Sequence, residues 1–146
     1  MFQEIFSSSP ILLPVLVLVI WTLVMQSWMV LTRLPAMTAA KLDVQAAERT
    51  ADLAAKLPKQ VQWKADNYNH LLEQPTIFYA AALTLAIAGL GDGANLVLAW
   101  IYVASRVAHS IVHATINKVL IRFTLFGIGS LALLVMTVNG ALKLVG

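Results

Sequence analysis

Four long stretches of the chain contain almost no charged residues. They are residues 5–32, 74–91, 93–117 and 123–142, and Arg106 is the single charged residue within them. A helix needs about 20 consecutive apolar residues to cross the hydrocarbon core of a bilayer. The apolar residues do not alternate with polar ones, as they would in the strands of a membrane barrel. The pattern therefore predicts four membrane-spanning helices, at about residues 10–32, 71–90, 94–117 and 120–143.

The composition supports this prediction. The chain has 146 residues, of which 60% are hydrophobic and 12% are charged, and its mean hydropathy is +0.80. A soluble domain of this length has a much lower apolar content. We therefore expect one all-α integral membrane domain, a four-helix bundle in contact with membrane lipids. Because the chain has no cysteine, disulfide bonds, thiolate nucleophiles and cysteine-ligated metals are excluded.

The first apolar stretch has a competing interpretation as a signal peptide. A signal peptide begins with a basic segment, whereas residues 1–10 contain Glu4 and no Lys or Arg. The uncharged run is also longer than the apolar core of such a peptide. We expect this stretch to be a transmembrane helix of the mature protein.

The basic residues are unevenly distributed between the predicted connections. Of the ten Lys and Arg residues, eight lie in or beside the first and third connections: Arg33, Lys41, Arg49, Lys56, Lys59, Lys64, Lys118 and Arg122. Cytoplasmic connections of membrane proteins are enriched in Lys and Arg. The first connection, residues 33–66, is therefore expected in the cytoplasm and both termini outside it. The placement of the basic residues thus accounts for the net charge of +3 through membrane topology, and we expect no nucleic-acid partner.

The predicted connections differ in length. The second and third are short, which makes the helices that they join antiparallel neighbours. The second contains Gly89, Gly91 and Gly93, which give the backbone the freedom that a tight turn needs. The first is long, and its residues 46–56 are rich in Ala, Lys and Glu, which predicts a helical extension with a solvated face that ends near Pro58.

A polar stripe runs along the third predicted span. Arg106, His109, His113 and Asn117 are separated by steps of three, four and four residues, which places them on one helical face about 16 Å long. Polar groups at membrane depth turn inward toward a partner or a cavity. A buried Arg needs an anionic partner, and apart from Asp66, Glu73 is the only carboxylate close to the apolar spans on the cytoplasmic side. We expect an ion pair between Glu73 and Arg106, either as a clamp between helices or as part of a site.

Proline and histidine add two further expectations. Pro75 has no amide hydrogen, so it leaves the carbonyl of Leu71 free and opens the second span. His109 and His113 have the i, i+4 spacing that can ligate a metal or a haem, with His70 as a third ligand. A helical histidine pair in a polar stripe more often forms a hydrogen-bond relay, and a proton path is a further alternative. We do not expect a metal site.

Three segments carry a resemblance to a known family. They are NYNHLLEQPTIFY at 67–79, WIYVASRVAHSIVH at 100–113 and NKVLIRF at 117–123. The chain resembles the bacterial branch of the MAPEG family, membrane-associated proteins in eicosanoid and glutathione metabolism. The resemblance is close over the last three predicted spans, and it rests on length and topology in the first span and the first connection.

The resemblance implies a function and an assembly. It implies a homotrimer in a bacterial inner membrane, with ligand sites between protomers toward the cytoplasmic side. Glutathione is then the co-substrate, and a lipophilic small molecule approaches from the membrane. The implied activity is glutathione-dependent transfer or peroxide reduction on lipophilic electrophiles.

The resemblance also assigns roles to residues. Arg122 falls where the family's enzymes have a catalytic Arg that stabilises the glutathione thiolate. Glu73 matches a glutathione-contacting Glu, Arg106 and His109 match an Arg-x-x-His pattern, and Arg33 is a further basic contact. The ligand-binding residues expected on this basis are Arg33, Asn69, His70, Glu73, Arg106, His109 and His113.

The chain departs from the family pattern at four of these or neighbouring positions. His70 stands where the enzymes commonly have Asn, Asn69 and Asp66 stand where Arg residues are frequent, and His113 replaces a Tyr. Losing the two basic residues weakens recognition of the glutathione carboxylates. Two alternatives to an enzyme therefore stay open: a non-catalytic, lipid-binding membrane scaffold, and a protein with a histidine-ligated metal or haem.

Overall fold

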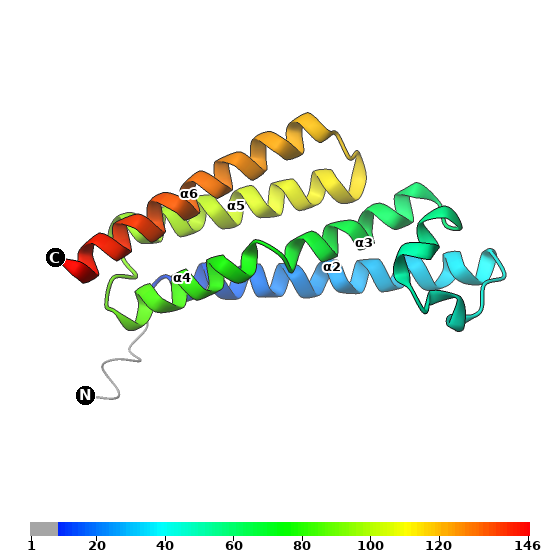
Figure 1. Ribbon diagram of the computed structural model, residues 1–146, viewed down its shortest axis with the longest axis horizontal. Helices are drawn as coiled ribbons and strands as arrows, with labels where there is room; N and C mark the ends of the chain where they lie inside the picture. Colours follow the sequence, from blue (N-terminus) through cyan, green and yellow to red (C-terminus); the bar gives the residue numbers. More distant parts are fainter. Residues whose placement is uncertain (1–8) are drawn as a thin grey trace.

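The computed structural model describes residues 9–146, which are helical in seven segments and contain no strand (Figure 1). The segments are α2 (Leu12–Ala39), the short 3-10 helices η1 (Val44–Ala47) and η2 (Thr50–Ala55), α3 (Lys59–Leu71), α4 (Pro75–Ile87), α5 (Gly93–Thr115) and α6 (Val119–Val145). The argument against a signal peptide rests on residues 1–10, of which residues 1–8 lie outside the described part of the chain.

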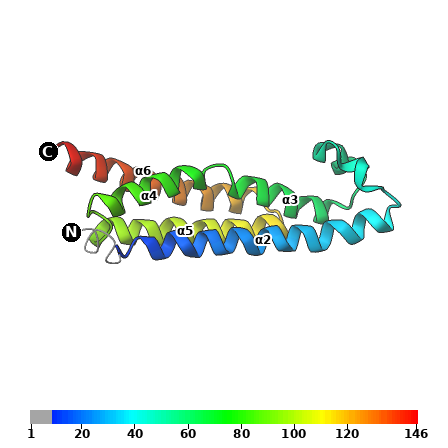
Figure 2. The same cartoon turned by 90° about the horizontal axis from the view of Figure 1, so that it is seen from below.

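The helices lie side by side along one axis. α3 and α4 follow each other in line beside α2, and α5 and α6 form an antiparallel pair (Figures 1 and 2). α2 and α3 extend beyond the turn between α5 and α6, and η1 and η2 lie at that end. The core between the helices is apolar and includes Phe78 and Tyr102, whose rings stack with centroids 4.4 Å apart.

Three helices in the described residues are long and apolar enough to cross a membrane: α2, α5 and α6. The shortest of them, α5, has 23 residues and spans about 34 Å at the ordinary rise of a helix. Their surfaces carry many exposed large apolar side chains, such as Leu31, Leu131 and Leu142. These features support a multi-pass membrane protein, because a soluble protein does not expose so large an apolar surface.

The second predicted span is not one continuous helix. The sequence predicts a helix over 71–90, but α3 ends at Leu71 and α4 begins at Pro75, so the prediction is wrong in its bounds. Pro75 occupies the first turn of α4, where its missing amide hydrogen is not needed. Because the same residue cannot donate to the carbonyl of Leu71, the expected opening of the helix is a complete break at residues 72–74.

Small residues bring α6 close to its neighbours. A Cβ atom on Gly129 would overlap the side chain of Ser105, and one on Gly140 would overlap the side chain of Leu85. Helices in membranes associate through such small residues, because there is no hydrophobic gain from burying one apolar surface in place of another. α6 is therefore seated against both α5 and α4 by direct contact.

The first connection differs from the prediction. α2 continues past residue 32 to Ala39, although Pro35 lies inside it, and Lys41 then reverses the chain in a left-handed conformation with φ +55°. The helix expected over 46–56 is wrong, because the chain there forms η1 and η2. Within this connection the chain must turn back and bury Leu53 against Met37 and Leu57, which a straight helix would prevent.

Candidate functional site

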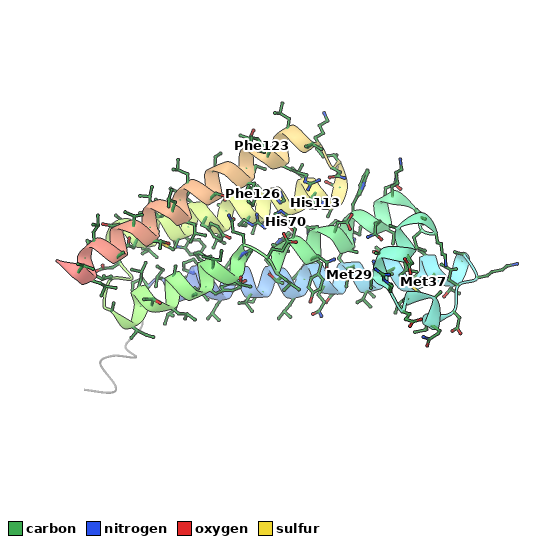
Figure 3. The ribbon with its side chains drawn as sticks, in the orientation of Figure 1. Met29, Met37, His70, His113, Phe123 and Phe126 are labelled. Atoms are coloured by element: carbon green, nitrogen blue, oxygen red, sulfur yellow. The ribbon has the colours of Figure 1, made fainter. Side chains whose placement is uncertain are left out.

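A pocket with polar and apolar walls opens where α3 ends against α5 and the start of α6. It has a volume of about 210 Å³, and its walls are His70, His109, Val119, Arg122, Phe123 and Phe126. Figure 3 shows His70, His113 and Phe126 close together where these helices meet. We call it the imidazole pocket. It places a permanent cation and two imidazoles among apolar side chains.

The polar stripe of α5 faces the interior of the bundle. Arg106 is fully buried, and only 2% of His109 and 4% of His113 are exposed. Ser110 on the same helix is also buried and accepts a hydrogen bond of 2.7 Å from the side-chain amide of Asn67. Asn117 does not belong to this stripe, because α5 ends at Thr115 and Asn117 has φ +49°.

Three histidine rings form a cluster beside the pocket. The ring centroids of His70 and His109 are 4.9 Å apart and the rings are stacked, and His113 lies edge-on to both at 6.1 and 5.7 Å. Among residues 9–146, no group of three or more His, Asp or Glu side chains is arranged to hold a metal ion. The three rings therefore pack against one another beside the pocket.

The expected ion pair between Glu73 and Arg106 is not formed. Glu73 is exposed, and the Nη2 atom of Arg106 instead donates to Nδ1 of His70 at 2.8 Å and to the backbone oxygen of His70 at 3.1 Å. His70 lies in the last turn of α3, where free carbonyls carry the partial negative charge of the helix. The end of α3, which the break before Pro75 creates, therefore supplies the acceptors for Arg106 that the sequence analysis assigned to a carboxylate.

This contact fixes the protonation of His70. A guanidinium group donates hydrogen bonds and cannot accept them. The Nδ1 atom of His70 must therefore accept, which leaves the ring proton on Nε2 in a neutral imidazole. The guanidinium carbon of Arg106 also lies 5.6 Å from the ring centre of Phe126, a second weak source of stabilisation for the cation.

Several buried polar atoms around the pocket have no hydrogen-bond partner. They are Nε and Nη1 of Arg106, Nε of Arg122, and Nδ1 of His109 and His113. Buried polar groups are normally paired, and an unpaired group costs about 1–3 kcal/mol. The unused donors belong to two arginines, so an anionic group would pair with them.

Arg122 enters the pocket from the first turn of α6. Its Nη1 atom donates to the side-chain oxygen of Asn117, which lies in the turn between α5 and α6. The left-handed backbone of Asn117 places that oxygen beside the start of α6. Asn117, which the sequence analysis assigned to the stripe, is thus a support for Arg122.

The structure divides the predicted site residues between two places. His70, His109 and Arg122 line the imidazole pocket. Arg106 and His113 do not line it, but both contact His70. Arg33 and Asn69 line a different pocket, between α2, η2 and α3. Glu73 lines neither of these two pockets.

The sequence analysis missed the apolar half of the imidazole pocket. Val119, Phe123 and Phe126 form this wall. Phe126 lies four residues after Arg122, and this spacing on a helix would have placed the two side chains on one face. The analysis also missed Gln74, which donates to Ser130 at 2.9 Å and accepts from Tyr102 at 3.4 Å, and so joins the break to α5 and α6.

Comparison with known proteins gives one match. The curated proteins and the solved structures yielded none. The family model described as the MAPEG family matches residues 11–142, which include every helix but the end of α6. The resemblance to the MAPEG family is therefore confirmed, and this chain belongs to that family.

Proposed function

We propose that this protein is a glutathione-dependent transferase or peroxidase that acts on lipophilic electrophiles, with Arg122 as its catalytic residue. The observation that carries the proposal is the imidazole pocket, where the cation of Arg122 stands beside an apolar wall of Val119, Phe123 and Phe126. Membership of the MAPEG family is consistent with this activity. The residues proposed to bind glutathione in this pocket are His70, Arg106, His109 and His113, while Arg33, Asn69 and Glu73, which the resemblance also assigns to glutathione, do not line this pocket within one chain.

The proposed role of Arg122 is to hold the thiolate form of glutathione. A free thiol has a pKa of about 8.5 and is mostly protonated at neutral pH. A nearby cation in an apolar setting stabilises the thiolate, and Arg keeps its charge at all ordinary pH values. In transfer, the thiolate sulfur forms a bond to an electrophilic carbon and a halide leaves. In peroxide reduction, two glutathione molecules and a hydroperoxide give the disulfide, an alcohol and water.

The proposed topology has four membrane crossings, and the second is formed by the end of α3 together with α4, over about residues 71–90. The connection between α2 and α3 and the turn between α5 and α6 lie at the same end of the bundle (Figure 1). Eight of the ten basic residues are in or beside these two connections, which supports a cytoplasmic position for this end. Both termini would then be outside the cytoplasm, and the host membrane would be a bacterial inner membrane.

We also propose a homotrimer, with the imidazole pocket completed by a neighbouring protomer. Phe123 forms part of the pocket wall and yet is 73% exposed. An exposed wall residue beside unpaired arginine donors suits a site that a second chain covers. Chemical cross-linking in detergent and in lipid tests the trimer, and a ladder ending at the dimer would contradict it.

Replacement of Arg122 tests the catalytic role. Arg122→Leu should reduce glutathione turnover with an aryl halide at least about 100-fold, because an ion-stabilising donor contributes that much to catalysis. Arg122→Lys should recover part of the activity, and thiolate absorbance on addition of glutathione should fall in the order wild type, Lys, Leu. Lys118→Leu is the matched control, since Lys118 is an exposed cation in the same turn and does not line the pocket.

The same measurements can also contradict the proposed enzymatic activity. A wild-type protein with no saturable glutathione binding and no thiolate absorbance would favour the lipid-binding scaffold. The observation on the side of that alternative is the polarity of α3, where Asp66 and Asn69 stand in place of basic residues. A visible spectrum and a metal analysis of the same sample test the metal or haem alternative.

A further inference from the structure

The imidazole pocket contains a hydrogen-bond donor that the protein itself does not use. Arg106 donates to Nδ1 of His70, so the ring proton of His70 is on Nε2. Among residues 9–146, no group accepts a hydrogen bond from this Nε2 atom, and the atom is not buried. Because His70 lines the pocket, its N–H is available to a molecule that enters beside the cation of Arg122.

Several contacts fix the orientation of this imidazole. Nη2 of Arg106 also donates to the backbone oxygen of His70, the ring of His109 stacks on the imidazole with centroids 4.9 Å apart, and Phe126 meets its edge at 5.7 Å. A donor that is held by packing and by a hydrogen bond on its other side is preorganised for a charge that develops opposite it. Arg106 is thus a positioning residue for His70.

The polar groups of the pocket donate hydrogen bonds but do not release protons. Guanidinium groups stay charged at all ordinary pH values, and His70 is a neutral imidazole. Protonation of His109 would add a third positive charge to those of Arg106 and Arg122, which Coulomb repulsion opposes. Reduction of a hydroperoxide needs an acid that protonates the departing oxygen. Addition to a conjugated carbonyl needs only hydrogen bonds to an oxygen whose charge is delocalised, so this donor set fits addition better.

The walls of the pocket favour a flat ligand. Four of its six wall residues carry rings: His70, His109, Phe123 and Phe126. Aromatic rings pack against one another in stacked or edge-to-face arrangements, as His70 and Phe126 do with an interplanar angle of 74°. A planar conjugated molecule can meet these rings with its face and edges while its oxygen reaches Nε2 of His70.

We propose that the electrophile of this site is a planar conjugated carbonyl compound of the quinone class, and that the Nε2–H group of His70 is a catalytic donor to its carbonyl oxygen. The inference rests on the proposed function, because Arg122 must hold a glutathione thiolate. His70 then contacts both substrates, glutathione with its ring and the quinone with Nε2–H.

The proposed reaction is a conjugate addition. The thiolate sulfur forms a bond to the quinone carbon that is β to the carbonyl, and the displaced electron pair ends on the carbonyl oxygen. Water removes the proton from the substituted carbon and protonates the oxygen. The product is the glutathione-substituted hydroquinone, so no other oxidant or reductant is needed.

A comparison of two acceptors tests the role of His70. Menadione, a methylated naphthoquinone, gains charge on oxygen during addition, whereas para-nitrobenzyl chloride loses chloride and its oxygens take no part. The measured quantity is the ratio of kcat for the quinone to kcat for the chloride, after subtraction of the uncatalysed rates. A change in glutathione binding affects both acceptors and cancels in this ratio.

Two variants of His70 form a matched pair. In His70→Asn the side chain can still accept from Arg106 but ends short of the Nε2 position, and the ratio should fall at least about 100-fold. In His70→Gln the amide nitrogen reaches that position, and the ratio should stay within about threefold of wild type. Phe126→Leu should lower the preference in kcat/KM for menadione over an open-chain unsaturated aldehyde by about fivefold.

A spectroscopic measurement tests the donor directly. In protein labelled with isotopic nitrogen in its histidines, the NMR spectrum should contain a neutral imidazole protonated at Nε2 that is missing from His70→Asn. A His70 ring protonated at Nδ1 would overturn the proposal, because the pocket would then meet an acceptor.

The proposed function and this inference fail in different ways. Turnover of both acceptors with equal ratios in wild type, His70→Asn and His70→Gln would overturn the inference and leave the enzyme. If the wild type forms no glutathione thiolate, the enzyme fails, and the site is tested by binding of dimethyl-naphthoquinone, whose reactive carbon is blocked, to protein in lipid nanodiscs. Saturable binding that weakens about fivefold in His70→Asn but not in His70→Gln would support the carbonyl site. Absent binding, or equal binding in all three proteins, would overturn it.

Discussion

Two halves of this bundle, α5–α6 and α2–α4, differ in regularity and meet at the contact between Arg106 and His70. The α5–α6 half consists of two unbroken helices in contact through small residues, and its polar stripe follows ordinary helical spacing. The α2–α4 half contains a long helix, a folded connection and a break before Pro75. Arg106 of the first half is held by the helix end that this break creates. The regular half supplies the charge, and the irregular half supplies its partner.

The largest effect is expected from crowding the regular half. Gly129→Leu should lower the free energy of unfolding by about 3 kcal/mol, because the new side chain would overlap Ser105 and push α6 away from α5. Reversible unfolding in mixed micelles measures the change. Gly127→Leu is the matched control on the same helix, since Gly127 has open space around it, and its stability should not fall. Equal losses in the two variants would show that the α5–α6 contact is not close.

The next effect concerns the point where the halves meet. His70→Ala removes one acceptor of Arg106 and should cost about 2 kcal/mol, as is usual for a hydrogen bond to a charged group. Glu73→Gln should change stability by less than about 0.5 kcal/mol, because Glu73 is an exposed residue. A double-mutant cycle with Arg106→Met should give a coupling energy for His70 and none for Glu73. Coupling to Glu73 would restore the ion pair that the sequence suggested.

The sequence predicts the regular half more fully than the irregular half, for a physical reason. Helical spacing fixes which residues of α5 share a face, so the burial of Arg106, His109 and His113 follows from the chain alone. The partner of Arg106 does not, because both of its acceptors belong to His70, the uncharged ring nitrogen Nδ1 and a backbone carbonyl, and a search for a carboxylate does not find them. Pro75 indicated an opening, but its consequence for Arg106 depends on the packing of α3 against α5.

The pocket between α2, η2 and α3 also could not be predicted from local sequence spacing. Arg33 and Asn69 were grouped with the residues of the imidazole pocket because a family resemblance places them near one ligand. In this chain η2 folds back beside α2 and α3, and both residues line a pocket there that Arg122 does not line. The fold of the 40–58 connection depends on the burial of Leu53 among Met37 and Leu57, a contact between distant residues that local spacing does not reveal.

Each half also contains one non-glycine residue in the left-handed region, and the turn of the regular half is expected to respond more strongly. Asn117→Ala should be about 1 kcal/mol less stable than Asn117→Gly, since alanine tolerates φ +49° poorly and glycine adopts it without strain. Both variants lose the hydrogen bond to Arg122, so their difference isolates the backbone. Thermal midpoints in one detergent compare them, and equal midpoints would assign the whole effect to Arg122.

The smallest effect is expected at the corresponding turn of the irregular half. Lys41 has φ +55° after the end of α2, and the amide of Leu42 donates to the carbonyl of Met37 at 3.0 Å, so the turn has the form that normally ends in glycine. Lys41→Gly should raise the free energy of unfolding by about 0.5 kcal/mol, because glycine adopts this conformation without strain. Lys41→Ala loses the same charge without relieving the strain, so it should bring no gain. Unfolding by denaturant compares the two. A gain in both variants would point to the charge of Lys41, and this turn would then be unstrained, unlike the turn at Asn117.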